Sequence, residues 1–357
     1  MKNIYIVSLK YSAGLFKEIL CLKDCFLESG FNVNTVLHHH YRNVQTLDKG
    51  LKSNSFFSGF KTALNIANEV AKSKPNIIFF YNSHPLNFLY LILGMLFFSR
   101  SRRVLVLHEP NKKRIFKNYG YHGFFVLLIT IFNKCQSWLC TDIVVLSPYA
   151  EKLYNESIGY NPFCRVHQAR ILLPPLELDR DTDPGKISFI GNINSTKGVG
   201  WFLDLAEHAS LKSPSLKFAI VTGSTLQESV KDRVCSLQNN LALYNPKILY
   251  DDEISSCLRK SSLVFCLHKS VTQSGVFVEC MRHGVPTIVL NEAGFTQFLD
   301  GSGVSVTGSS NYNEILSAIN TIFLARDKFT VAAKKNYNEN FDARLFPIFY
   351  ASFINDL

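Results

Sequence analysis

The stretch Leu263–Leu290, LVFCLHKSVTQSGVFVECMRHGVPTIVL, decides the fold. An apolar strand is predicted at Leu263–Leu267, a helix at Val276–Arg282, and a second apolar strand at Thr287–Leu290. Polar residues precede the helix, and a Gly-Val-Pro segment ends it. Two continuous apolar strands joined by a helix predict a parallel β–α–β unit that is covered on both faces.

The same alternation extends outward in both directions. The second half is predicted to contain strand Ile187–Ile190, helix Trp201–Ala209, strand Phe218–Val221, helix Leu226–Asn239, strand Lys247–Tyr250 and helix Glu253–Lys260. The first half is predicted to contain the strands Ile4–Leu9, Val33–His38, Ile77–Tyr81, Arg103–Leu107 and Ile143–Leu146, with helices at Gly14–Ser29 and Phe60–Ser73.

A stretch rich in Pro and Asp separates the two series. Residues 172–185, LLPPLELDRDTDPG, have no periodicity and are typical of a linker. We therefore expect an α/β protein with two Rossmann-like domains, at residues 1–175 and 187–335, joined by a linker at 176–186. An aromatic helical segment at 336–357 ends the chain.

The charge is distributed unevenly. The 357 residues are 47% hydrophobic and 18% charged, as in globular proteins. Residues 1–175 carry 21 Lys and Arg against 9 Asp and Glu, a net charge of +12. Residues 176–357 carry 17 against 19, so the total is +10. The basic first half predicts an anionic partner on one side of the protein.

Cysteine usage favours a reducing compartment. The nine Cys form no C-x-x-C pair and no metal-ligand spacing. The first nine residues, MKNIYIVSL, have only a short apolar core and no small-residue cleavage site after it. They therefore predict a strand rather than a signal peptide.

Two apolar runs raise the question of membrane contact. Phe88–Phe98 and Gly123–Phe132 are shorter than the ~20 residues that span a bilayer. Basic clusters adjoin them at Ser99–Arg103 (SRSRR) and Asn111–Lys117 (NKKRIFK). The pattern predicts peripheral association with an anionic membrane, in which Arg100, Arg102 and Arg103 contribute. Buried helices with solvated basic ends are the alternative.

Two segments have the composition of a diphosphate site. In Phe189–Gly198, FIGNINSTKG, a strand ends at Gly191, and Lys197 stands before a helix. Thr272–Gly275 places Gln273 and Ser274 at the start of the next such helix, with Glu279 one turn further. Helix N-termini and a Lys attract phosphate. An ordinary strand–helix turn and an N-cap with a solvated Glu are the alternatives.

In order, the motifs FIGN-x4-KG, FAIVTGS, YDDEI and LVFCLHKSVTQSGVFVECMRHGVPTIV resemble the C-terminal half of GT-B glycosyltransferases, in particular family 4 enzymes of bacterial surface polysaccharide synthesis. The resemblance covers about residues 187–300. It implies two domains with parallel sheets facing across a cleft, and a C-terminal helix that returns toward the N-terminal domain.

The resemblance also implies a donor site. Gly191, Lys197, Ser274 and Gly275 would hold the diphosphate and Glu279 the ribose. The remaining members of the expected donor site are Gly14, Asn192, Gly223, Gln273 and Val276. Asn192 stands where many members have Arg, and Val271 stands where many have the first Glu of a Glu-x7-Glu pair. These departures indicate a different donor or, alternatively, an inactive enzyme.

The first half is expected to hold the acceptor and part of the catalytic wall. Ser12 and Gly14 follow the first strand, and His84 and His108 follow two others, at the strand ends where open α/β sheets bind ligands. By position, His108 resembles the family histidine that contacts the transferred sugar, and Glu109 is placed to orient it. We expect catalytic roles for His108, Glu109 and Lys197, and acceptor contacts from Ser12 and His84. A satisfied turn residue is the alternative for each His.

No metal is expected. Adjacent side chains in His38–His40 diverge, and Asp251–Asp252 are placed to cap a helix. The diphosphate charge would be met by Lys197 and two helix N-termini, and no cofactor besides the nucleotide-sugar co-substrate is implied.

The sequence thus predicts a metal-independent, retaining hexosyltransferase at the cytoplasmic face of the membrane. It would act on a polyprenyl-diphosphate-linked saccharide in O-antigen, capsule or lipopolysaccharide synthesis, with no nucleic acid partner. A GT-B nucleotide-sugar 2-epimerase and a non-enzymatic membrane or nucleic-acid adaptor are the alternatives. A dinucleotide-binding oxidoreductase is disfavoured because no G-x-G-x-x-G follows the first strand.

Overall fold

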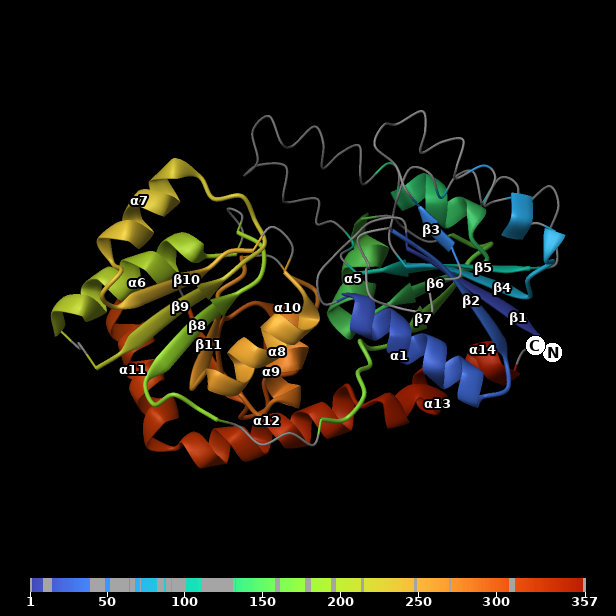
Figure 1. The fold of residues 1–357 in the computed structure, drawn as a ribbon. Coiled ribbons are helices and arrows are strands. Elements are labelled where there is room, and N and C mark those ends of the chain that lie inside the picture. Colours follow the sequence, from blue (N-terminus) through green and yellow to red (C-terminus); the bar gives the residue numbers. More distant parts are fainter. Residues whose placement is uncertain are drawn as a thin grey trace. The chain divides into compact units, whose positions relative to one another are not determined.

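The computed structural model divides the chain into two compact units, Met1–Leu172 with Ala343–Leu357, and Leu173–Asp342. It describes residues 2–8, 15–38, 49–51, 64, 68–70, 72–81, 87, 91, 101–108, 110, 131, 133–157, 161–176, 181–193, 197–212, 215–246, 249–269, 271–307 and 312–355. Each unit is built on a parallel sheet (Figure 1). The expected α/β class is therefore confirmed.

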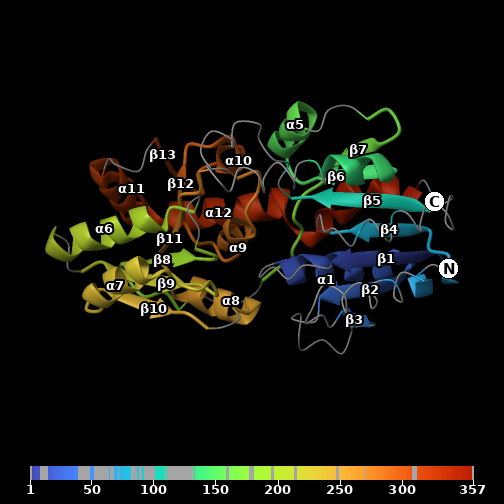
Figure 2. The ribbon, with the colours of Figure 1, turned by 90° about the horizontal axis from the view of Figure 1, so that it is seen from above.

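The first unit has a seven-stranded sheet in the order β3-β2-β1-β4-β5-β6-β7, which Figure 2 shows from one edge to the other. Its elements are β1 (Asn3–Ser8), α1 (Leu15–Glu28), β2 (Asn32–His38), β3 (Lys49–Leu51), β4 (Ile77–Phe80), β5 (Arg102–Leu107), β6 (Asp142–Val145), α5 (Pro148–Ser157) and β7 (Arg165–Gln168). The chain reverses direction across the sheet between β1 and β4, and open α/β sheets bind ligands at such a point.

The C-terminal segment belongs to this first unit, as the resemblance implies. It comprises a 3-10 turn at Ala343–Leu345, α13 (Phe346–Phe349) and α14 (Ala351–Asn355). Phe346 packs on Phe26 of α1 with ring centroids 4.8 Å apart, and Phe353 packs on Phe79 of β4 at 5.3 Å. The end of the chain therefore contributes aromatic side chains to the core of the domain that begins it.

The structure corrects the expected role of Arg102, which begins β5. Arg102 is buried and donates two hydrogen bonds to the carboxylate of Asp142 and one to the carbonyl oxygen of Ser352. Arg103 donates to the carbonyl oxygen of Leu139. A buried, paired guanidinium cannot meet lipid phosphates, so Arg102 fixes the C-terminal segment instead of docking the protein. Arg100 lies outside the described residues.

The second unit has a six-stranded sheet in the order β10-β9-β8-β11-β12-β13. Its elements are β8 (Lys186–Ile190), α6 (Val199–Lys212), β9 (Lys217–Val221), α7 (Glu228–Ser236), β10 (Leu241–Tyr244), α8 (Asp251–Lys260), β11 (Leu263–Cys266), α9 (Gly275–Arg282), β12 (Thr287–Leu290), α10 (Ala293–Thr296), β13 (Gly303–Val306), α11 (Tyr312–Leu324) and α12 (Arg326–Asn340). Side chains of α6 and α11 share one hydrophobic core on this sheet, in which Phe202, Phe218 and Phe265 pack edge to face or tilted.

One predicted strand of the second unit is wrong. The sequence suggests Lys247–Tyr250, whereas the strand that pairs with β9 is β10, at Leu241–Tyr244. Both runs are apolar and short, and three of the four β10 side chains are exposed at the sheet edge. Leu249, in the other run, is buried without belonging to a strand, so burial alone does not locate this edge strand.

The predicted apolar runs Phe88–Phe98 and Gly123–Phe132, and the cluster Asn111–Lys117, fall almost entirely outside the described residues. Among the helices that the structure does describe, none has the length and hydropathy needed to cross a bilayer.

Candidate functional site

The candidate site lies at the carboxyl edge of the second sheet. The chain runs from β8 outward to β9 and β10, then crosses back to β11 on the other side of β8. The loops that follow β8 and β11 therefore leave adjacent strands, and open α/β sheets bind ligands at such a point. Both predicted phosphate-binding segments begin in these two loops.

The loop after β8 has a conformation that requires glycine. Gly191 has φ of +118° and donates its N–H to the carbonyl oxygen of Val221 at 2.9 Å. A Cβ at this position would lie 3.8 Å from Val276 Cγ2, so the loop passes beside the start of α9. The two expected donor segments therefore approach each other at Gly191 and Val276.

The far end of the same loop is equally constrained. Gly198 has φ of +71°, and a Cβ there would lie only 2.6 Å from the carbonyl oxygen of Leu267. This close approach fixes where the loop turns into α6 and keeps the half-buried Lys197 near the end of β11. Asn192 is exposed, and residues 194–196 lie outside the described residues.

The start of α9 presents the second segment. Ser274 is the N-cap, and its hydroxyl accepts a hydrogen bond of 3.5 Å from the N–H of Phe277. Within the described part of the chain, no atom lies within 4 Å of a Cβ built at Gly275, at the first turn of α9. Gln273 is 7% exposed, and neither polar atom of its amide has a hydrogen-bond partner among the described residues. A buried amide without partners is costly, which is typical of a group that awaits a ligand.

Glu279, the expected ribose contact, is buried and already ion-paired. Arg282 Nη1 lies 3.1 Å from its carboxylate, and Arg282 Nε donates to the carbonyl oxygen of Pro174 at 2.7 Å. His283 Nδ1 lies 3.5 Å from the same carboxylate. A ribose diol at Glu279 would therefore share the carboxylate with Arg282, a constraint that the sequence spacing did not reveal.

His268 is a candidate that the sequence analysis missed. It lies two residues after the end of β11, is 4% exposed, and packs its ring against Phe295 with ring centroids 5.3 Å apart. Burial lowers the pKa of His268 well below its ordinary value, and the positive charge of Lys197 lowers it further. The imidazole is therefore neutral beside the loop that carries Lys197. Its position after a buried strand is the same signal that singled out His84 and His108.

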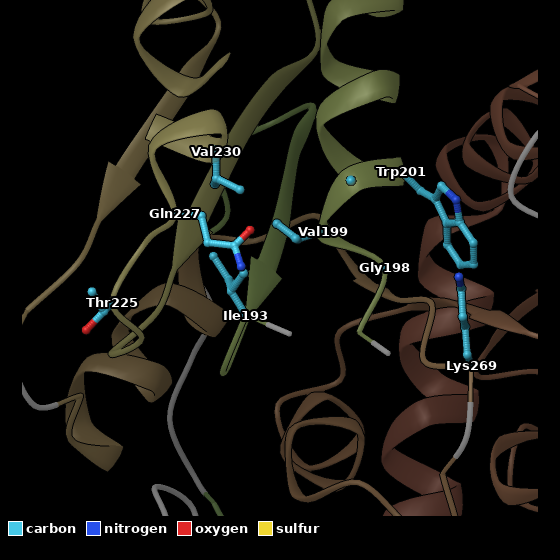
Figure 3. Close-up of a pocket in the computed structure, with 9 residues that line it drawn as sticks. Ile193, Gly198, Val199, Trp201, Thr225, Gln227, Val230 and Lys269 are labelled. Atoms are coloured by element: carbon cyan, nitrogen blue, oxygen red, sulfur yellow. The ribbon is translucent and has the colours of Figure 1, made fainter. Parts of the chain in front are cut away.

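A pocket of about 340 Å³ adjoins this loop (Figure 3). Figure 3 shows Lys269 and Trp201 pointing toward each other, and Lys269 Nζ lies 4.7 Å from the centre of the indole ring. The pocket is formed by the starts of α6 and α7 and is lined by Ile193, Gly198, Val199, Gly200, Trp201, Thr225, Gln227, Val230 and Lys269. None of the residues predicted at the start of α9 lines this pocket, so the pocket is not the expected donor site. It shares Gly198 with the loop that carries Lys197. Gly223 instead packs against Leu249, 3.2 Å from a built Cβ.

Of the catalytic and acceptor residues predicted in the first unit, the structure describes only His108. His108 follows β5, and its ring centroid lies 5.6 Å from that of Tyr81, which follows β4. Burial lowers the pKa of His108 to about 4, opposed by a hydrogen bond with the backbone of Tyr81. Ser12, Gly14, His84 and Glu109 lie outside the described residues.

Tyr81 links His108 to a buried acid. Its hydroxyl donates a hydrogen bond of 2.8 Å to Glu18 Oε1 in the first turns of α1. Burial raises the pKa of Glu18 to about 8, although the Tyr81 hydrogen bond lowers it. Glu18 and His108 are thus joined through one tyrosine at the point where the order of the first sheet reverses.

Acidic clusters of the described residues do not suggest a metal centre. Within that part of the chain, no three His, Cys, Asp or Glu side chains are grouped closely enough to hold an ion. Asp251 and Asp252 lie in the first turn of α8, where Glu253 accepts a hydrogen bond of 2.7 Å from the Tyr250 N–H. Their position is that of helix N-terminal acids.

The comparison with known protein families gives a match within the second unit. Residues 184–324 match the family model of glycosyl transferases group 1. The sequence matches none of the curated proteins with which it was compared.

Solved structures resemble the whole chain at low sequence identity. S. aureus TarM, solved with UDP and α-GlcNAc-glycerol, is 11% identical with a TM-score of 0.74, over 99% of this chain and 100% of that one. The pneumococcal O-GlcNAc transferase GtfA, solved with UDP and GlcNAc, is 7% identical with a TM-score of 0.76, over 99% of each. A Listeria monocytogenes protein assigned as a UDP-N-acetylglucosamine 2-epimerase is 14% identical with a TM-score of 0.64, over 100% and 98%. The chain therefore has the GT-B fold that its motifs imply.

Proposed function

We propose that the protein is a glycosyltransferase that takes its sugar from a nucleoside diphosphate donor. The observation that carries the proposal is the meeting of two segments in the second unit: Gly191 passes beside Val276, at the start of α9, above adjacent strands of a parallel sheet. Lys197 belongs to the same loop, and the matched family segment 184–324 contains all three residues. A diphosphate suits a site that combines backbone N–H groups with a Lys.

The residues divide the work in the following way. The ammonium of Lys197 and the free N–H groups at the start of α9 stabilise the negative charge that develops on the departing diphosphate. Charge stabilisation of this kind needs no metal, and retention of the anomeric configuration follows if the acceptor attacks from the face that the diphosphate leaves. Burial lowers the pKa of His108 to about 4, so near neutral pH its imidazole would act on a sugar as a neutral hydrogen-bonding group rather than as a positive charge.

The acceptor in this proposal is a saccharide linked to a polyprenyl diphosphate, as in surface polysaccharide synthesis. The net charge of +12 on residues 1–175 supports it, because an anionic lipid surface and a pyrophosphate linkage would both attract that half. The protein would then work at the inner face of the cytoplasmic membrane.

Donor binding is tested by thermal stabilisation with a panel of UDP-, GDP- and dTDP-sugars. One donor is expected to raise Tm, because a ligand at about 100 times its Kd adds about 2.7 kcal/mol. Lys197→Ala is expected to reduce the affinity for that donor about tenfold or more, because a hydrogen bond to a charged group is lost. Lys335→Ala, an exposed lysine of α12, serves as the matched control. Stabilisation by no donor, or equal affinity in both variants, would contradict the assignment.

Product analysis then separates transfer from epimerisation, since the GT-B fold alone does not. Incubation with the stabilising donor, with and without a lipid-linked acceptor, is followed by NMR of the products. A new glycoside formed only with acceptor supports the proposal, and its anomeric coupling reports retention. An epimerised donor formed without acceptor would favour the epimerase, and EDTA should leave the transfer rate unchanged.

A further inference from the structure

One helix of the first unit exposes apolar and basic side chains and buries polar ones. Residues 133–139 are helical, and Ile131 is helical just before them. Among the described residues of this helix, the exposed side chains are Ile131 at 47%, Trp138 at 61%, Lys134 and Cys135, and none of them is acidic. The spacing of three and four residues places Ile131, Lys134 and Trp138 on one face of the helix.

The opposite face of this helix is buried and polar. Asn133, Gln136 and Ser137 are at most 3% exposed. Asn87 Nδ2 donates to Gln136 Oε1 at 3.3 Å, and Asn161 Nδ2 donates to the carbonyl oxygen of Ser137 at 3.1 Å. Because these hydrogen bonds hold the polar face inward, the helix cannot rotate to hide Trp138 without leaving buried amides unsatisfied.

A second exposed aromatic side chain, Phe163, lies in the segment that Asn161 ties to this helix. Asn161, which binds the helix, also accepts a hydrogen bond of 3.0 Å from the N–H of Phe163, and Phe163 is 85% exposed. Arg165 begins the edge strand β7, and its side chain is 56% exposed while its Nε contacts Asp142 at 3.1 Å. We give the name aromatic–basic surface to two groups together: Ile131, Lys134 and Trp138 on the helix, and Phe163 and Arg165 in the segment that Asn161 ties to it.

The charge of the surrounding sequence selects the partner. The segments 131–141 and 161–170 contain Lys134, Arg165 and Arg170 and no Asp or Glu. Exposed Trp and Phe beside Lys and Arg are the composition that lies at the boundary between lipid headgroups and acyl chains. Protein interfaces are enriched in Trp, Phe and Arg but depleted in Lys, so Lys134 and the lack of Asp and Glu in these segments favour a lipid surface.

We propose that the aromatic–basic surface docks the first unit onto an anionic lipid membrane. Trp138 and Phe163 enter the headgroup region, while Lys134 and Arg165 contact lipid phosphates. The proposal rests on the proposed function only in that a lipid-linked acceptor would be met at this surface, and it moves docking away from Arg102 and Arg103, whose side chains are engaged within the fold.

The tryptophan content allows a direct test. The chain has two Trp, so Trp201→Phe leaves Trp138 as the sole indole. With phosphatidylglycerol-containing vesicles, the emission of Trp138 is expected to shift to shorter wavelength and to be quenched by brominated acyl chains. Phosphatidylcholine vesicles should produce neither effect, and added salt should weaken binding.

Variants in the full-length chain identify the surface. Trp138→Ser with Phe163→Ser should reduce vesicle binding about tenfold or more, and Lys134→Ser should reduce it about fivefold. Leu324→Ser is the matched control, because Leu324 is 89% exposed on α11 of the other unit. Circular dichroism and donor-induced stabilisation report whether each variant is folded.

Several outcomes would overturn the proposal. Vesicle binding without a change in Trp138 emission would place the membrane contact elsewhere, and absence of vesicle binding would remove it. A shift that depends on protein concentration without vesicles would assign the surface to a second copy of the chain. Failure of donor binding with intact vesicle binding would instead overturn the proposed function alone.

Discussion

At the scale of single residues, Glu18 departs from the usual exposure of acidic side chains. It is 3% exposed, and the Tyr81 hydroxyl donates to its carboxylate. The pKa of Glu18 is raised to about 8, chiefly by burial. Perturbed acids of this kind concentrate at functional sites, and the chain through Tyr81 to His108 places this one beside the expected catalytic wall.

The raised pKa predicts a specific pH dependence of stability. Between pH 4.5 and about 8 the folded state keeps the Glu18 proton that the unfolded state has lost, so stability falls as pH rises through this window. Glu18→Gln keeps a neutral acceptor for Tyr81. It should raise Tm at pH 8 by about 5 °C or more, with little change at pH 4.

The measurement is Tm against pH from 4 to 9 for both proteins. Glu28→Gln, on the exposed side of the same helix, is the control and should leave the slope unchanged. A slope that is identical in wild type and Glu18→Gln would show that Glu18 does not carry a raised pKa.

The candidate site shows which residues a sequence can disclose. Gly191 and Gly198 are predictable because a strand–loop–helix pattern ending in Lys-Gly restricts the backbone, and both have positive φ. The ion pair of Glu279 with Arg282 and the unpartnered amide of Gln273 are not predictable, because they depend on which side chains the fold brings into contact. His268 was predictable from its place after a strand and was overlooked.

At the scale of elements, continuous apolar runs predicted the central strands well. Thr287–Leu290 is β12 as expected, and Ile77–Phe80 and Leu263–Cys266 differ from their predictions by one residue. Edge strands were missed or misplaced: β7 has the polar sequence RVHQ, and β10 is mostly exposed. An edge strand is defined by its pairing more than by burial, and pairing is a tertiary property.

The loop between β8 and α6 provides a matched pair of glycines for a test. Gly198→Ala would place a Cβ 2.6 Å from the Leu267 carbonyl oxygen at φ of +71°, so a destabilisation of about 1–3 kcal/mol and weaker donor binding are expected. Gly200→Ala meets nothing within 4 Å at the start of α6, where Ala favours the helix by about 0.5–1 kcal/mol.

Chemical denaturation and donor titration of both variants provide the measurement. Opposite signs in stability are the expected result, with donor affinity reduced only in Gly198→Ala. Equal effects of the two substitutions would mean that the close approach of Gly198 to β11 is unimportant for the loop.

At the scale of the whole molecule, the chain leaves the first unit once and returns to it. The crossing residues are tied together within the second unit: Leu173 N donates to the Phe341 carbonyl oxygen at 2.9 Å, and the Tyr337 hydroxyl donates to the Leu173 carbonyl oxygen at 2.6 Å. The last 15 residues then complete the first unit's core. Stability of the first unit therefore depends on residues that lie beyond the second in sequence.

Phe353 and Ile348 test this dependence within one segment. Phe353 is fully buried against Phe79, His167 and Arg102, so Phe353→Ala should destabilise the first unit by about 3–5 kcal/mol. Ile348 is 69% exposed, and Ile348→Ala should have little effect.

Hydrogen exchange measured by mass spectrometry is expected to accelerate in β4 and β7 of Phe353→Ala only. Donor-induced protection at residues 187–290 should persist, because a unit that retains its own core opens independently of its neighbour. Equal acceleration in the second unit would show that the two units unfold as one, and the donor site would then depend on the end of the chain as well.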